Sequence, residues 1–203
     1  MEELGLFPLG IVLLPTERIP LHVFEPRYKE LIGECLDEER EFGMLLVDED
    51  GLRRVGTRAR VVTVLERFDD GRLNIVVEGG DRFVLAELIE GRAYHTGTVL
   101  PLDDEEAAND PEAAERALDA FRRVAKLAEA EIEDPTSASP RLSLELAARV
   151  ELPADRKQEL LELRSEPARL RLVSELLADA ARALVLQREL RERASRNGER
   201  PLG

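Results

Sequence analysis

Residue types that carry enzyme chemistry are scarce in this sequence. Its 203 residues include one cysteine, Cys35, two histidines and no tryptophan. A single cysteine cannot form an internal disulfide, and two isolated histidines lack the spacing of a zinc site. We therefore expect no structural disulfide, no metal and no cofactor, and a protein of a reducing compartment.

Long apolar runs are also missing. The longest, Leu9–Leu14, ends at Pro15 and is far shorter than the roughly 20 residues that cross a bilayer. The start of the chain, Met1–Glu3, lacks the basic and apolar stretches of a secretory signal. We expect a cytoplasmic protein with no membrane partner.

The charge balance argues against nucleic acid as a partner. The formal net charge is −14, whereas nucleic-acid binding depends on lysine and arginine neutralising phosphates. The first half of the chain holds one basic cluster, formed by Arg53, Arg54, Arg58 and Arg60. RNA binding is therefore a minor alternative that requires these arginines to form an exposed basic stripe.

The hydrophobic pattern changes near residue 104 and predicts two domains, 1–104 and 105–203. In the first domain, short apolar runs separated by Gly, Pro and Asp are typical of strands. The sequence Asp69–Gly71 predicts a tight antiparallel hairpin. Six strands are predicted, at Leu6–Leu14, Phe42–Val47, Arg60–Arg67, Arg72–Glu78, Arg82–Glu90 and Tyr94–Leu102.

One helix interrupts these strands. Pro26 suits a first helical position, and an apolar stripe follows at helical spacing. The stripe is formed by Tyr28, Leu31, Ile32, Cys35 and Leu36. Because Cys35 lies on it, we expect a buried thiol that packs rather than reacts.

The second domain has the composition and period of a bundle of about four helices. The first should run from Pro111 to about Glu133, capped by Asp110, and a loop should cover residues 134–140. A short helix should follow near Leu142–Val150, and Asp155 and Gln158 have capping-box spacing for a third. The last should begin near Ser165, reach about Arg193 and leave a frayed, charged tail.

The amino-terminal block resembles the opening of the Lon protease amino-terminal domain. The similarity rests on Leu6–Leu9, Val12–Pro15 and Pro20–Tyr28, continues in order to residue 102, and returns more loosely at Leu152–Pro153 and Lys157–Leu161. Many members of the family carry a glycine after Pro15, where this chain has Thr16.

The resemblance implies a PUA-like β-barrel with one inserted helix, followed by helices, and thus an α+β fold. It also implies a module that captures unfolded or degron-bearing polypeptides, with a protease or a chaperone as a further partner. The module occurs in this family as a stand-alone protein as well.

The catalytic parts of a Lon protease have no counterpart in this sequence. A Walker A loop needs a Gly-Lys pair, and the three lysines, Lys29, Lys126 and Lys157, do not follow glycine. All six serines lie between Ser137 and Ser195, in the helical half, and there is no G-x-S-x-G elbow. We expect a non-catalytic protein; an enzyme with an unrecognised site remains the main alternative.

The string Pro20–Tyr28 is the most distinctive in the chain and has two interpretations. In the structural one, Phe24 and Tyr28 pack against the sheet and Arg27 pairs with a nearby glutamate. In the functional one, His22, Arg27 and Tyr28 line a groove that binds polypeptide. These three residues are our candidate binding site.

Overall fold

The computed structural model describes residues 2–106, 110–131 and 135–198. Contacts divide the chain into two compact units, Met1–Glu106 with Ala147–Ser165, and Ala107–Leu146 with Glu166–Gly203. The elements within the described residues are β1 (Glu2–Leu9), β2 (Arg18–Val23), α1 (Pro26–Asp37), β3 (Phe42–Asp48), β4 (Gly51–Arg67), β5 (Leu73–Ile89), β6 (His95–Pro101), α2 (Pro111–Ala128), α3 (Leu142–Ala147), α4 (Ala154–Glu162) and α5 (Glu166–Gly198).

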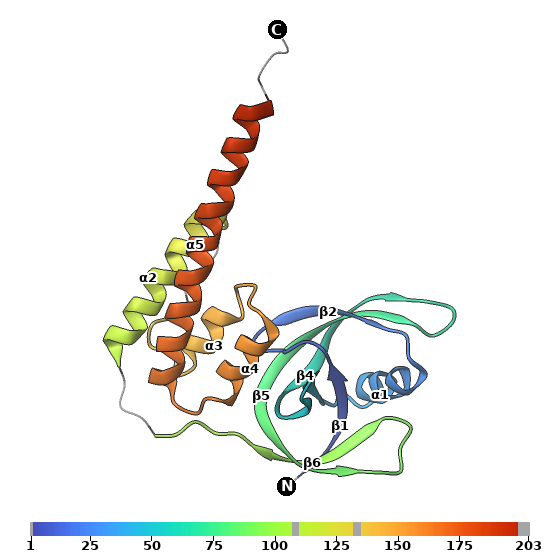
Figure 1. Cartoon of the computed structure of the whole chain (residues 1–203). Coiled ribbons are helices and arrows are strands. Elements are labelled where there is room, and N and C mark those ends of the chain that lie inside the picture. The colour runs from blue at the N-terminus through green and yellow to red at the C-terminus, as the bar shows by residue number, and fades with distance from the viewer. Residues whose placement is uncertain (1, 107–109, 132–134, 199–203) are drawn as a thin grey trace. The chain divides into compact units, whose positions relative to one another are not determined.

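The strands of the first unit close into a barrel (Figure 1). β1 pairs in parallel with β3 and antiparallel with β6, while β5 pairs antiparallel with both β4 and β6. The ring β1–β3–β4–β5–β6 is therefore complete. β2 joins β5 from outside the ring as the end strand of the sheet order. The expected α+β fold, a barrel followed by helices, is confirmed.

The predicted hairpin at Asp69–Gly71 is confirmed. β4 and β5 pair antiparallel on either side of it, with Arg67 opposite Leu73. Gly71 has φ +82°, a backbone conformation that glycine adopts without a side-chain penalty. The Phe68 amide donates to the Arg72 carbonyl (3.0 Å) and closes the turn.

Several strand predictions were wrong. The strand expected at Leu6–Leu14 runs over Glu2–Leu9, and the one expected at Arg60–Arg67 already begins at Gly51. The chain forms one strand, β5, where we expected a break at Gly79. The Gly79 amide donates to the Glu17 carbonyl (2.9 Å), and its missing side chain admits the Leu14 carbonyl oxygen to 2.1 Å from the Cβ position. Glycine here thus allows a close backbone approach instead of a turn. We also did not predict β2, in which Pro20 takes a strand position that proline rarely occupies.

The helix predicted from Pro26 is confirmed as α1. Pro26 occupies its first turn, and Tyr28, Leu31, Ile32 and Cys35 are buried. They pack in one cluster with side chains from the barrel strands, among them Phe7, Phe42, Ile75 and Val77. Burial of this apolar stripe is what fixes α1 on the barrel.

Residues 147–165, which we had assigned to a helical domain at 105–203, pack with the barrel unit instead. Arg82 of β5, which is 7% exposed, donates to the carbonyls of Leu161 (2.8 Å) and Leu163 (2.7 Å) at the end of α4. A cation at a helix carboxyl end is favourable because unpaired carbonyls point there. This buried contact explains why the segment returns to the barrel.

The capping box predicted at Asp155 and Gln158 was wrong. The N-cap of α4 is Pro153, and no side chain caps the helix. Gln158 is buried instead, and its amide donates to the Val55 carbonyl of β4 (3.1 Å). A sequence spacing cannot distinguish a capping side chain from one that faces another element.

The second unit is helical. Asp110 caps α2 by accepting from the Ala113 amide (2.9 Å), as predicted, but α2 ends at Ala128, because Glu129 is left-handed (φ 55°). α5 continues beyond the predicted Arg193 to Gly198. Arg169 of α5 is fully buried and bonds to Glu166 (2.6 Å). The predicted end of the first helix and the first loop residue, at 132–134, and part of the predicted tail, at 199–203, lie outside the described residues.

Gly79→Ala tests the close approach of the β1–β2 loop to β5. The new methyl group would meet the Leu14 carbonyl, which is backbone and cannot rotate away. We expect the free energy of unfolding, measured by urea titration, to fall by about 1–3 kcal/mol. Gly10→Ala, whose Cβ would meet nothing within 4 Å, is the control and should leave stability nearly unchanged. Equal stability of the two variants would contradict this packing.

Candidate functional site

The three candidate residues do not lie together on one surface. Tyr28 is 4% exposed and stacks on Phe7, with ring centroids 4.0 Å apart. Arg27 covers it, with its guanidinium 4.6 Å from the Tyr28 ring, and bonds to Glu25 (2.7 Å). Tyr28 therefore belongs to the core, and His22 and Arg27 are the candidates that reach solvent.

A different aromatic group surrounds His22. The rings of Phe24 and Phe68 lie 5.8 and 6.1 Å from the imidazole, and Phe24 is 59% exposed. The Arg72 guanidinium lies 4.8 Å from the Phe68 ring. We call His22, Phe24 and Phe68 the aromatic cluster. The expectation that Phe24 packs against the sheet was wrong, because it follows the same outward alternation as His22.

Polar side chains fix the strands beneath the aromatic cluster. His22 Nδ1 donates to Asn74 Oδ1 (2.6 Å), and Asn74 Nδ2 donates to Glu66 Oε2 (3.0 Å). This ladder crosses β2, β5 and β4 in turn, so the imidazole is held in one orientation.

A second ladder crosses the same three strands, where Glu78 accepts from Arg18 (2.6 Å) and from Arg60. These hydrogen bonds, first the one from Arg60 and then the one from Arg18, hold the pKa of Glu78 below its usual value. The carboxylate therefore stays charged and keeps both arginines in place on the outer face of the sheet.

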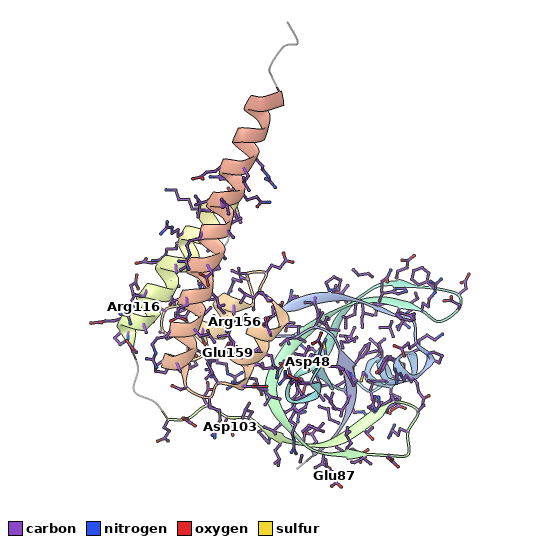
Figure 2. The ribbon with its side chains drawn as sticks, viewed as in Figure 1. Asp48, Glu87, Asp103, Arg116, Arg156 and Glu159 are labelled. Atoms are coloured by element: carbon purple, nitrogen blue, oxygen red, sulfur yellow. The ribbon has the colours of Figure 1, made fainter. Side chains whose placement is uncertain are left out.

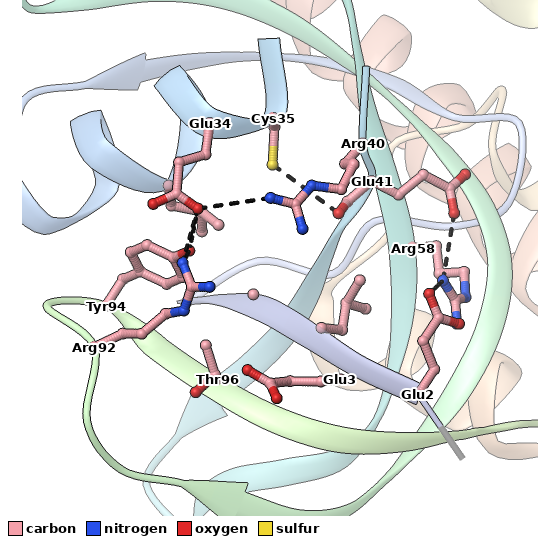
Figure 3. A pocket seen from close by; sticks show the side chains of 13 residues that line it. Glu2, Glu3, Glu34, Cys35, Arg40, Glu41, Arg58, Arg92, Tyr94 and Thr96 are labelled. Carbon is pink, nitrogen blue, oxygen red and sulfur yellow. Dashed lines mark hydrogen bonds and ion pairs between the residues drawn. The ribbon is translucent and has the colours of Figure 1, made fainter. Parts of the chain in front are cut away.

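A cavity of about 400 Å³ lies elsewhere on the barrel unit (Figure 3). Its charged groups largely satisfy one another. Glu34 Oε2 accepts from Arg92 (2.9 Å) and from the Tyr94 hydroxyl (2.7 Å), and Arg58 pairs with Glu2 (2.6 Å). The lining residues are Glu2, Glu3, Leu4, Gly5, Leu31, Glu34, Cys35, Arg40, Glu41, Arg58, Arg92, Tyr94 and Thr96.

Cys35 is in a poor environment for a nucleophile. Burial raises the pKa of its thiol to about 11, so the thiolate is scarce at neutral pH. The buried, packing thiol that we expected is confirmed. Among the described residues, no group of three or more His, Cys, Asp or Glu side chains is placed to hold a metal ion.

The arginines behind the RNA-binding alternative are engaged by other groups. Arg53 pairs with Asp48, which is labelled in Figure 2, at 2.7 Å. The other three arginines also have acceptors within the barrel unit. The acceptors are Asp48 and Asp50 for Arg53, the Leu85 and Ala86 carbonyls for Arg54, Glu2 and Glu41 for Arg58, and Glu78 for Arg60. Carboxylates thus pair with three of the four arginines and backbone carbonyls hold Arg54, so the cluster is not a free basic stripe and the alternative loses its support.

Residues 3–179 match the family described as the ATP-dependent protease La (LON) substrate-binding domain. The Lon protease of Anaeromyxobacter dehalogenans (strain 2CP-C) is 29% identical over 192 residues, which cover 86% of this chain and 23% of that protein. Lon protease 2 of Myxococcus xanthus is 27% identical over 194 residues, covering 87% and 23%. The chain thus spans about a quarter of the length of these curated relatives.

Two solved structures share the fold. The Lon N-terminal domain protein from Xanthomonas campestris has a TM-score of 0.66 and 25% identity, covering 88% of this chain and 98% of that one. The N-terminal domain of the Mycobacterium avium complex Lon protease has a TM-score of 0.66 and 20% identity, covering 88% and 99%. Separately, no helix in the described residues is long and apolar enough to cross a membrane.

The pKa of Tyr94 tests the hydrogen bond between its hydroxyl and Glu34 in the cavity. Burial, and then the hydrogen bond to Glu34, raise the pKa of Tyr94 to about 12. The chain has two tyrosines and no tryptophan, so ultraviolet absorbance reports their ionisation cleanly. We expect Glu34→Gln to lower the pKa of Tyr94 part of the way towards 10.0, because it removes the carboxylate charge. Glu30→Gln, on the exposed side of α1, should leave it unchanged.

The raised pKa of Tyr94 also makes the free energy of unfolding depend on pH in the alkaline range. Because the folded state holds the Tyr94 proton more tightly than the unfolded state, this contribution is complete below pH 10.0 and is lost as pH rises towards about 12. Urea unfolding should show this fall, and Tyr94→Phe should reduce it. An unchanged slope in Tyr94→Phe would contradict the assignment.

Proposed function

Because this chain belongs to the family of the Lon protease substrate-binding domain, we propose that it binds polypeptides and does no chemistry of its own. Its ligands are unfolded or degron-bearing chains in the cytoplasm, and a protease or a chaperone is the partner that receives them. The family is named for substrate binding and not for the catalytic domains.

The aromatic cluster is the observation that carries this proposal. Phe24 leaves 59% of its surface in water, and β4, which β5 separates from β2, carries Leu65, which is also 59% exposed. Unfolded polypeptides expose apolar side chains that folded proteins bury, and aromatic rings offer them large contact areas at a low entropic cost. A surface of this kind therefore favours unfolded chains over folded ones.

Charged groups beside the cluster suit a polypeptide better than a small metabolite. Arg72 covers Phe68 and pairs with Asp70 (2.7 Å), and Glu25, the residue after Phe24, accepts from Arg27. Both signs of charge thus flank the rings, as in the polar rim of a protein interface. The cavity of Figure 3, by contrast, has its charges paired internally, so it gives the enzymatic alternative no specific support.

Phe24→Ser and Phe68→Ser test the proposal. Each removes one ring of the aromatic cluster, the exposed Phe24 or the partly buried Phe68, so we expect binding of a reduced and carboxymethylated, permanently unfolded protein to weaken at least about fivefold by fluorescence anisotropy. Folding should change little for Phe24→Ser, because the ring is mainly in water.

The matched control is Leu186→Ser on α5, which alters an apolar side chain of similar exposure, 57%. It should bind the unfolded protein like the unmodified chain. Equal binding by all three variants would rule out the aromatic cluster as the site, and no binding by the unmodified chain would reject the proposed function.

A further inference from the structure

β2 has one paired edge and one open edge. It pairs antiparallel with β5, with Arg18 opposite Glu78 and Val23 opposite Leu73, and it is the end strand of the sheet order. The Gly79 amide donates to the Glu17 carbonyl next to the first of these pairs. Glu17 and Gly79 are therefore a hydrogen-bonded pair. Because bonded and non-bonded pairs alternate in an antiparallel ladder, the next pair, Arg18 and Glu78, has no backbone hydrogen bonds between its members.

The register therefore decides which backbone groups face outwards. Because bonded and non-bonded pairs alternate, Ile19, Leu21 and Val23 bond to β5, while Arg18, Pro20 and His22 turn their backbone groups to the open edge. These three residues present three carbonyls and, since proline has no N–H, two amides. Among the described residues, no hydrogen bond to these outward groups is found.

We propose that the bound polypeptide adds to β2 as an extended strand, pairing its backbone with Arg18 and His22. This rests on the proposed function and specifies how the ligand is held. A row of unpaired backbone amides and carbonyls is complementary to another extended backbone. A helical ligand, whose backbone bonds are already made, cannot provide it.

The side chains beside this edge favour a segment with alternating apolar residues. Ile19 and Leu21 are partly buried and pack against the barrel core, so side chains on the same face of an added strand would lie beside them. On the other face, Pro20 and His22 are exposed, and Phe24 of the aromatic cluster follows. Apolar side chains on alternate positions of the ligand therefore extend the core, and those between them contact the rings.

Pro20 argues against a second copy of this chain as the occupant. A two-fold symmetric pair of β2 strands centred on Pro20 would place the two prolines opposite each other, where neither has an amide to donate. A foreign polypeptide has no such restriction, because any of its residues can lie opposite Pro20. Proline on an edge strand is a known protection against self-pairing.

A short fluorescent peptide of alternating valine and threonine tests the proposal. N-methyl groups on two adjacent central residues block both of its edges, whereas the same groups at its amino-terminal end leave the centre free. We expect the centrally methylated peptide to bind at least about tenfold more weakly, because each lost hydrogen bond weakens binding several-fold. The terminally methylated peptide should bind like the unmodified one.

Two variants of the protein isolate the backbone amide of His22. His22→Ala removes the imidazole alone, and His22→Pro also removes the outward amide without breaking a bond to β5. We expect His22→Pro to bind the peptide several-fold more weakly than His22→Ala at similar melting temperature. Pro20→Ala adds an amide to the edge and should tighten binding.

The outcomes separate this proposal from the proposed function. If the methylated and unmodified peptides bind equally, and His22→Pro equals His22→Ala, strand addition is overturned while polypeptide binding stands. If neither the peptide nor the unfolded protein binds, both are overturned. If the unmodified chain sediments as a dimer that His22→Pro dissociates, a second copy occupies the edge and the proposal fails.

Discussion

Strand β5 makes the hydrogen bonds on which the barrel unit depends, because it pairs with three other strands. Its residues face β2 and β4 along the first part and β4 and β6 along the second. Register shifts at several points let β4 and β5 bend together, since bulges increase local twist. This bend closes the ring, and it leaves β2 as the strand with an open edge within the described sheet.

The same strand holds the distant segment 147–165 on the barrel. Arg82 lies in the second half of β5, and its guanidinium bonds to Asp104 as well as to the end of α4. At the other end of the interface, Lys157 of α4 pairs with Glu17, whose carboxylate also accepts from the Leu14 amide (2.9 Å). Buried charges are stable only when paired in this way. The β1–β2 loop and α4 therefore support each other, and the loop fixes where β2 begins.

Local signals predicted the elements that depend on local chemistry. Pro26 and the apolar stripe after it predicted α1, Asp110 predicted the start of α2, and Asp69–Gly71 predicted the hairpin. The sequence failed where a residue serves a distant partner. Nothing near Gly79 reveals that the Leu14 carbonyl needs its space, and nothing near Gln158 reveals the Val55 carbonyl.

The candidate site shows the same limit. His22 was selected from a distinctive string, and it does lie on an exposed surface. Phe68 was missed because it lies at the β4–β5 hairpin, 46 positions after His22 in the numbering. Only the pairing of β2 with β5 brings the two rings together. Tyr28 lies on the apolar stripe of α1, and its burial agrees with that stripe instead of with the groove interpretation. Strand alternation from His22 was the available signal for the exposure of Phe24.

Pro20 connects the missed strand with the proposed mode of binding. A proline counts against a strand in sequence-based prediction because it cannot donate to a ladder. In β2 that missing amide faces the open edge, so it costs no bond to β5. The edge is thereby weakened for pairing with itself and remains usable by a chain of another sequence. An edge protected only in this partial way is what a polypeptide-binding module needs, because it must stay soluble while it offers backbone groups to unfolded chains.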